Sequence, residues 1–236
     1  MTRVKPVRRP LLREVIYTEG HFKMLREMRQ EAMKVMSSLE ARGVVSFLHG
    51  SAARGDVNAR SDIDIVALDV IPSYKVELAL SDIGYEPLAR FVTMATPSHA
   101  LKATIQLRNN IVVTFPLVKL KTLEHEFYKF GGICSLSDVM GQRRTRGVDK
   151  RLVLIEPNER GHLEMSILGS EVEVAKLLGI SIDLIRERER VLLRRDASGR
   201  TGVYLKKQVP PDESIEGWAE RIIRQNPPAI SKLRNR

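Results

Sequence analysis

The sequence predicts an α/β protein with a mixed β-sheet flanked by helices and a smaller C-terminal region that is helical or winged-helix-like. Two observations support this fold class. Short apolar segments typical of strands alternate with longer segments of helical periodicity over the first half of the chain. Glycine, proline and asparagine stand at the junctions, where strands and helices are expected to end. Such an alternation typically builds a sheet that is covered by helices.

The first half of the chain supplies the predicted layers in order. A helix is expected over 20–41, because apolar residues recur there at helical spacing, and Gly43 ends it before a strand that begins at Val44. A Gly50-Ser51 turn and a short helical segment then precede a second strand, which carries two aspartates. A further helix is expected at 73–83. Three strands are expected at 91–94, 103–107 and 111–115, with a turn at Asn109-Asn110 between the last two.

The second half of the chain is predicted to be more irregular. The Gly131-Gly132 pair and the basic segment up to Gly147 indicate a linker or mobile loop. Two helices after Ser170, hinged at 179–181, resemble a helix-turn-helix pair. His162 lies in a predicted turn and is expected to be structural or exposed. The remaining predicted elements are a strand at 151–155, a strand at 203–206 and a helix at 212–224.

These elements suggest four consecutive regions. We expect a basic N-terminal extension at 1–19 and a first α/β domain at 20–132. An α+β region with the possible helix-turn-helix follows at 133–208, and a C-terminal helix with a basic tail at 209–236.

Asp62 and Asp64 have the clearest chemical implication. Side chains at positions i and i+2 of a strand project from the same face, so these carboxylates point together while Ile63 and Ile65 face a core. Neighbouring carboxylates repel each other unless a cation lies between them. Mg²⁺ fits this role, because it binds oxygen ligands and shares its coordination with water and substrate phosphates.

The Gly50-Ser51 turn supplies a complementary group. A turn of small residues that opens a helix exposes backbone N–H groups, and these groups bind anions such as phosphate. After ten intervening residues the turn is followed by the two carboxylates. A phosphate-binding turn and a metal-binding pair in this order predict nucleotide chemistry.

The string GSAARGDVNARSDIDIVAL, which begins at Gly50, resembles the signature of the DNA polymerase β-like nucleotidyltransferase superfamily. It is especially similar to the small prokaryotic and archaeal members called minimal nucleotidyltransferases. The resemblance covers residues 20–118 and implies a polymerase β-like nucleotidyltransferase fold for the predicted domain at 20–132.

The resemblance also implies roles for individual residues. Gly50 and Ser51 would bind the triphosphate of a nucleotide, and Asp62 and Asp64 would be the catalytic acids that hold Mg²⁺ or Mn²⁺. Arg54 lies close enough in sequence to assist in binding the nucleotide phosphates.

One position departs from the pattern of that family. The family adds a third acidic residue on a later strand, which corresponds here to 111–115. The matching position holds Val113 or Thr114, and neither side chain is a carboxylate. Glu124 and Glu126 follow in a helical segment and are expected on its solvated face. Either another residue supplies the third ligand or the site is impaired.

Charge and cysteine content bear on partners and location. The net charge of +10 favours polyanionic partners, nucleic acid among them, and a generally basic surface is the alternative interpretation. The single cysteine, Cys134, excludes an intramolecular disulfide and fits a cytoplasmic protein. No apolar run approaches the roughly 18 residues that cross a bilayer, so no membrane partner is expected.

The helix after 179–181 is rich in arginine, the side chain that most often contacts phosphate and guanine. The candidate nucleic-acid contacts are Arg186, Arg188, Arg190, Arg194 and Arg195.

Together these features predict a metal-dependent nucleotidyltransferase. The enzyme would transfer a nucleoside monophosphate from a nucleoside triphosphate to a hydroxyl acceptor and release pyrophosphate. RNA and a protein hydroxyl are the favoured acceptors. Because the third acid is missing, the alternative is a non-catalytic nucleic-acid-binding protein that retains the fold.

Overall fold

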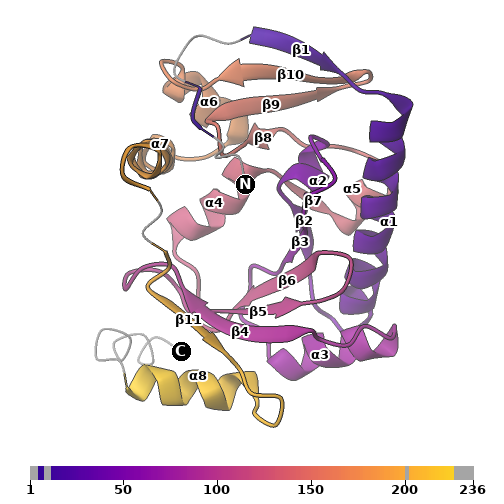
Figure 1. The fold of residues 1–236 in the computed structure, drawn as a ribbon, viewed down its shortest axis with the longest axis vertical. Helices are drawn as coiled ribbons and strands as arrows, with labels where there is room; N and C mark the ends of the chain where they lie inside the picture. Colours follow the sequence, from indigo (N-terminus) through magenta and orange to yellow (C-terminus); the bar gives the residue numbers. More distant parts are fainter. Residues whose placement is uncertain (1–4, 8–11, 200–201, 226–236) are drawn as a thin grey trace. The chain divides into compact units, whose positions relative to one another are not determined.

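A computed structural model describes residues 5–7, 12–199 and 202–225 of the chain. The described residues form an α/β protein with mixed sheets flanked by helices, which confirms the predicted fold class at this level (Figure 1). Among them, no helix is both long and apolar enough to cross a membrane. The predicted C-terminal tail after 225, and residues 1–4 and 8–11 of the N-terminal extension, lie outside the described residues.

A strand at 12–16 lies within the N-terminal extension, where none was predicted, whereas from residue 19 to residue 116 the secondary structure follows the predicted order. Its elements are β1 (Leu12–Ile16), α1 (Glu19–Ala41), β2 (Phe47–His49), α2 (Ser51–Arg54), β3 (Ile63–Val66), α3 (Ser73–Asp82), β4 (Ala89–Met94), β5 (Lys102–Gln106) and β6 (Ile111–Pro116). The second half contains α4 (Thr122–Gly131), β7 (Ile133–Ser135), α5 (Leu136–Met140), β8 (Gly147–Val148), β9 (Val153–Asn158), β10 (Gly161–Ser166), α6 (Glu171–Leu178), α7 (Ile182–Ser198), β11 (Leu205–Gln208) and α8 (Ile215–Arg224).

The chain divides into two compact units, and both are discontinuous in sequence. The first unit draws its described residues from 1–29, 48–61 and 122–201, and the second from 30–47, 62–121 and 202–236. The regions predicted from sequence, with boundaries at 19, 132 and 208, are instead each continuous in sequence.

The first unit contains an antiparallel sheet in the order β1-β10-β9-β8. Figure 1 shows β1, β10 and β9 as neighbouring strands. The core of this unit lies among β8, β9, α4, α6 and α7, and its fully buried members include Leu152, Ile167, Val174 and Ile185. The helices α6 and α7 meet at Gly179, which adopts the left-handed conformation (φ 61°, ψ 46°) that a glycine C-cap permits. This confirms the predicted pair of helices hinged at 179–181.

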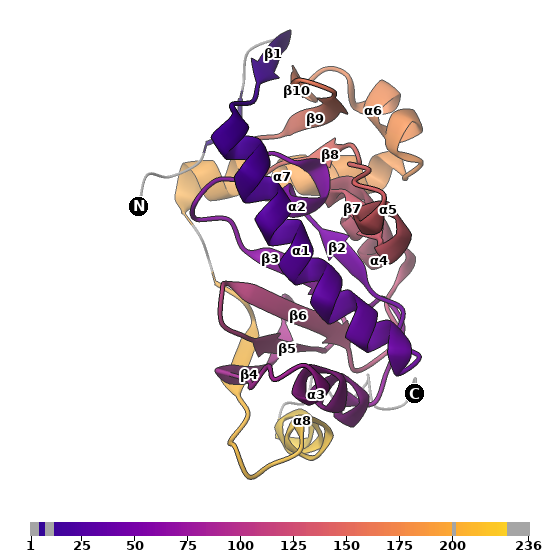
Figure 2. The same ribbon diagram turned by 90° about the vertical axis from the view of Figure 1, so that its right-hand side faces the viewer.

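The second unit is built on strands in the order β11-β4-β5-β6-β3, of which β3 and β6 are parallel and the other pairs antiparallel. One face of this sheet is buried, with Val92, Ile105, Val113 and Phe115 almost completely covered. Figure 2 shows α3 and α8 side by side. The Glu216 carboxylate of α8 accepts hydrogen bonds from the backbone N–H and the hydroxyl of Ser73, which opens α3, both at 2.6 Å.

The prediction of a linker or mobile loop from Gly131 to Gly147 is wrong. This segment forms β7, α5 and the start of β8, and both Gly131 and Gly132 are buried. The glycines reflect close packing: a Cβ on Gly131 would lie 2.4 Å from His49 Nε2, and one on Gly132 would lie 2.9 Å from Arg54 Cγ. A Gly-Gly pair predicts a mobile loop only where no neighbouring backbone approaches it.

The expectation of two solvated glutamates on α4 is also wrong. Glu124 is only 5% exposed. Glu126 accepts hydrogen bonds from the Ser181 hydroxyl and, at 3.1 Å, from the Ser181 backbone N–H, at the residue that caps α7. A carboxylate at a helix N-terminus is stabilising, so α4 helps to fix the start of α7.

Replacing Gly132 with alanine should destabilise the protein more than replacing Gly84. Both residues have positive φ (85° and 71°), so both substitutions introduce backbone strain. Only at Gly132 would the new Cβ also clash, whereas nothing lies within 4 Å of one at Gly84. We expect Gly132→Ala to lower the free energy of unfolding by about 1–3 kcal/mol more than Gly84→Ala does, measured by urea denaturation. Equal losses would contradict the packing argument.

Candidate functional site

Asp62 and Asp64 lie at the start of β3 in the second unit. Asp62 is exposed and directly precedes the strand, and Asp64 is its second residue and is half-buried. The intervening Ile63 and the following Ile65 are 2% and 0% exposed. The two carboxylates therefore share the open face of the strand, and the isoleucines share its buried face, as the alternation of a strand requires.

The neighbouring strand β6 shows which of Val113 and Thr114 lies on the same face of the sheet as Asp64. In the parallel register, Asp64 pairs with Val112 and Val66 pairs with Thr114. Val113 is 2% exposed and belongs to the buried face, so it cannot share a site with Asp64. Thr114 lies on the open face, where its hydroxyl is 3.4 Å from the Thr104 hydroxyl on β5. The third position is therefore neutral.

The donor set at β3 fits a metal ion that takes only part of its coordination from protein. Within the described ranges, no cluster of three or more His, Cys, Asp or Glu side chains could hold a metal ion by itself. Two carboxylates with neutral oxygens beside them suit Mg²⁺, which usually binds one or two protein carboxylates and completes its shell with water and phosphate oxygens.

The Gly50-Ser51 turn lies in the first unit, between β2 and α2. Gly50 has φ 74° and ψ −141°, a conformation that residues with a Cβ rarely adopt. Its N–H donates to the Gly132 carbonyl at 3.0 Å, and its own carbonyl accepts the first helical bonds, from Ala53 and Arg54. The amides of Ser51 and Ala52 come before the first of these bonds and are the donors that a helix start leaves for another acceptor.

Arg54, the predicted phosphate contact, is 6% exposed and turned into the first unit. Its Nε and Nη2 atoms donate to the two carboxylate oxygens of Asp56, both at 2.9 Å, and its Nη1 atom donates to the Gly131 carbonyl. These bonds attach α2 to the end of α4. A contact between Arg54 and a nucleotide stays a prediction that no observation supports.

Arg29 on α1 supports the same short helix, and sequence analysis missed it. The side chain is 6% exposed, and its guanidinium donates to the carbonyls of Ala52 (3.1 Å) and Arg143 (2.6 Å). Burial lowers the pKa of Arg29. An arginine on the apolar side of a helix was the available signal, because such a residue needs buried acceptors.

The candidate nucleic-acid contacts on α7 have different environments. Arg186, Arg190 and Arg194 are exposed, and Arg195 is half-buried. Arg188 is also half-buried, and its guanidinium carbon lies 4.9 Å from the centre of the Phe127 ring on α4. Nucleic-acid binding by these residues stays a prediction.

A buried polar network in the first unit surrounds His162, which is 3% exposed and therefore structural. The Tyr17 hydroxyl is 2.7 Å from Nδ1 of His162, and Nε2 of His162 is 3.4 Å from the Glu164 carboxylate. Glu164 also accepts hydrogen bonds from Arg13 (2.7 Å) and Arg151 (2.6 Å). A neutral imidazole with its proton on Nε2 satisfies both of its neighbours.

The pKa values in this network follow from burial and ion pairing. Burial lowers the pKa of His162, although the bond to Glu164 opposes the effect. Burial alone would raise the pKa of Glu164, but the hydrogen bonds from Arg151 and Arg13 lower it to about 2. The network is thus built around an ionised glutamate and a neutral histidine at neutral pH.

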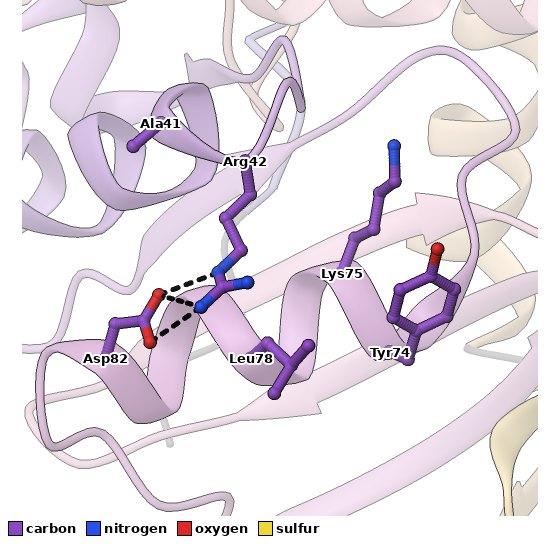
Figure 3. Close-up of a pocket in the computed structure, with 6 residues that line it drawn as sticks. All are labelled: Ala41, Arg42, Tyr74, Lys75, Leu78 and Asp82. Atoms are coloured by element: carbon purple, nitrogen blue, oxygen red, sulfur yellow. Dashed lines mark hydrogen bonds and ion pairs between the residues drawn. The ribbon is translucent and has the colours of Figure 1, made fainter.

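A surface depression of about 350 Å³ in the second unit carries none of the predicted site residues (Figure 3). Its lining comes from the end of α1 and from α3. The Arg42 guanidinium and the Asp82 carboxylate form a paired ion bridge there, with contacts of 2.7 and 2.8 Å. These two charges satisfy each other, and Tyr74, Lys75 and Leu78 of α3 complete the lining.

The structure thus groups the predicted residues in two sets. Asp62 and Asp64 lie together in the second unit. Gly50, Ser51, Arg54 and the arginines of α7 belong to the first unit. Comparison with protein-family models, curated proteins and solved structures found no match for this chain.

Replacing His162 with glutamine should flatten the dependence of stability on pH between about pH 7.5 and 5. The folded-state pKa of His162 lies below its unfolded value, about 6.5, so the unfolded chain takes up a proton first as the pH falls. His162 therefore favours the folded state fully above pH 6.5 and loses this contribution below it. As the pH decreases below 6.5, we expect the unfolding free energy of the wild type to fall relative to that of His162→Gln, by up to about 1.4 kcal/mol per pH unit.

Urea denaturation at a series of pH values measures this difference. Both proteins keep every other titrating group, so subtracting the two profiles isolates His162. Parallel profiles would show that His162 is not held neutral in the folded state.

Proposed function

We propose that this protein is a Mg²⁺-dependent nucleotidyltransferase that transfers a nucleoside monophosphate from a nucleoside triphosphate to a hydroxyl acceptor and releases pyrophosphate. One observation carries the proposal: two carboxylates, Asp62 and Asp64, share the open face of β3 while the isoleucines beside them are buried. Two adjacent carboxylates on one strand repel each other, and a cation bound between them would remove this repulsion.

Asp62 and Asp64 would hold the metal, Mg²⁺ or Mn²⁺. When bound, the metal neutralises charge on the phosphate oxygens during transfer. Thr114 on the same face can orient a water molecule or a hydroxyl by hydrogen bonding, but it cannot accept a proton as a carboxylate would. The acceptor hydroxyl must therefore lose its proton to one of the two aspartates or to water.

The Gly50-Ser51 turn would bind the phosphates of the nucleotide. The amides of Ser51 and Ala52 suit this role, because they begin α2 and have no helical acceptor. The unusual conformation of Gly50 supports the idea, since such strain commonly persists where backbone N–H groups must face a ligand. The polymerase β-like fold is part of the proposal. The order α1, β2, α2, β3 and the parallel pairing of β3 with β6 are consistent with it.

RNA and protein hydroxyls are the acceptors we favour, in a cytoplasmic setting. The net charge of +10 attracts RNA and disfavours a polycationic small molecule.

The second candidate function is a nucleic-acid-binding protein without catalysis. The neutral pair Val112 and Thr114 beside β3 favours it, because a third carboxylate is missing from that face. The exposed arginines Arg186, Arg190 and Arg194 would then contact phosphates.

Replacing both Asp62 and Asp64 with asparagine should abolish Mg²⁺-dependent binding of nucleoside triphosphates and any nucleotidyl transfer. Asparagine keeps the size of each side chain but removes the charge that binds the metal. Calorimetry with each nucleoside triphosphate, in the presence of Mg²⁺ or EDTA, measures the effect. Asp69→Asn is the matched control, because Asp69 is exposed just after β3 and should be replaceable without loss. If the wild type binds no nucleoside triphosphate, the enzyme proposal fails.

The nucleic-acid alternative predicts a steep dependence of RNA affinity on salt. If Arg190 and Arg194 each contact a phosphate, the double Arg190→Gln/Arg194→Gln variant should reduce the slope of log K against log salt by about 1–2. Fluorescence anisotropy on a labelled RNA at several salt concentrations measures the slope. A slope equal to that of the wild type would exclude these two arginines as phosphate contacts.

A further inference from the structure

The sheet of the second unit has an open face opposite α3. On β4, Arg90 belongs to the buried face, where its Nη1 atom donates to the Glu77 carboxylate of α3 at 2.8 Å. Val92, two residues further along the strand, is fully buried on the same face. Phe91 lies between them and is only half-buried. Because side chains alternate along a strand, Phe91 belongs to the open face.

The strand register places Phe91 and Asp64 on the same open face. Residues that pair directly across a sheet share a face, and so do residues two apart along a strand, such as Ala89 and Phe91. The pairs that connect the two strands are Asp64–Val112, Val112–Gln106 and Gln106–Ala89. β5 and β6 separate β4 from β3, and strands lie about 4.8 Å apart, so Phe91 is roughly 14 Å across the sheet from Asp64.

Polar and cationic side chains surround the Phe91 ring on this face. Thr104 on β5 pairs directly with Phe91, and its hydroxyl lies 3.4 Å from the Thr114 hydroxyl. Gln208 on β11 pairs with Phe91 from the other side. Lys206 is exposed, and its Nζ atom lies 4.5 Å from the centre of the Phe91 ring. The open face thus combines an aromatic ring, a cation and side chains that donate and accept hydrogen bonds.

This combination fits a single strand of RNA better than it fits a protein. Unpaired bases stack on aromatic side chains of a sheet, and a cation beside the ring can contact the backbone phosphates. Interfaces between proteins are instead depleted in lysine. The net charge of +10 also favours a polyanion. A duplex keeps its bases stacked inside, so a strand that places a base on Phe91 must be single.

We propose that the open face of this sheet binds single-stranded RNA, with a base stacked on Phe91 and a backbone phosphate on Lys206. The inference rests on the proposed function in one respect: the bound strand would be the acceptor, because Asp64 lies on the same face. The terminal hydroxyl of the strand would reach Asp64 a few nucleotides away from the stacked base. This surface belongs to the second unit, whereas the arginines of α7 belong to the first.

The first test removes the aromatic ring. The probe is a labelled single-stranded RNA of mixed sequence and roughly ten nucleotides, bound in EDTA and followed by fluorescence anisotropy. Phe91→Leu keeps apolar volume but loses the ring, and we expect it to bind about 5- to 100-fold more weakly. Phe91→Tyr keeps the ring and should bind like the wild type. Tyr74→Leu is the matched control, because it removes an exposed ring from α3, on the other side of the sheet.

The second test removes the cation. Lys206→Met should lower the slope of log K against log salt by about 0.7, the value for one phosphate contact of a single strand. Lys207→Met is the matched control: Lys207 is also exposed, but it pairs with Val92 and therefore belongs to the other face. The control should keep the wild-type slope. Because Lys206 is exposed, this test stays valid even if Phe91→Leu fails to fold.

Three results would overturn the inference. One is wild-type affinity in Phe91→Leu together with a wild-type slope in Lys206→Met. Another is an equal loss of affinity for the same RNA annealed to its complement, because a duplex cannot stack a base on Phe91. The third is loss of single-strand binding in Arg190→Gln/Arg194→Gln while Phe91→Leu binds normally, which would assign the RNA to α7.

The outcomes separate this inference from the proposed function. If binding of single-stranded RNA in EDTA depends on Phe91 but the wild type binds no nucleoside triphosphate, the RNA surface stands and the enzyme proposal fails. If nucleotidyl transfer depends on Asp62 and Asp64 while Phe91→Leu and Lys206→Met bind RNA like the wild type, the enzyme proposal stands and the inference fails.

Discussion

Close packing of backbone and side chains around glycine residues beside α2 is the constraint on which the candidate nucleotide turn depends. Gly131, Gly132 and Gly147 have no room for a Cβ, and Gly147 would place one 2.6 Å from the Gly132 nitrogen. Arg29 and Arg54 fill the remaining space and satisfy the carbonyls that this packing buries. A helix of four residues has little stability of its own, so its shape is imposed by these neighbours.

In the second unit, the alternation of side chains along two neighbouring strands determines the candidate metal site. Alternation along β3 and β6 separates a buried apolar face from an open polar face, and the parallel register decides which side chains meet. Asp64 and Thr114 share the open face for this reason alone. The chemistry available there follows from two negative charges and a neutral hydroxyl, so any reaction at this face must draw further positive charge from a metal ion or a substrate.

The elements that could be predicted from sequence are those with a local cause. The helix at 20–41, the paired isoleucines of β3 and the Asn109-Asn110 turn follow from periodicity and from residues that tolerate positive φ. The errors concern residues whose role depends on distant neighbours. Gly132 and Glu126 resemble loop and surface residues in sequence, yet their contacts lie far along the chain, at Arg146 and Ser181. The different surroundings of Arg54 and Arg188 arise in the same way and leave no local pattern.

The pairing of β1 with β10 has a consequence for how the chain is made. β1 leaves the ribosome well before its partner at Gly161–Ser166, because the elements from α1 to β9 are synthesised between the two strands. Until then the first strand has no edge to join, and the first unit cannot close its sheet. A nascent chain therefore carries an unpaired strand for the whole interval between the synthesis of β1 and that of β10, and this is the period when a chaperone that binds nascent chains would have most to protect.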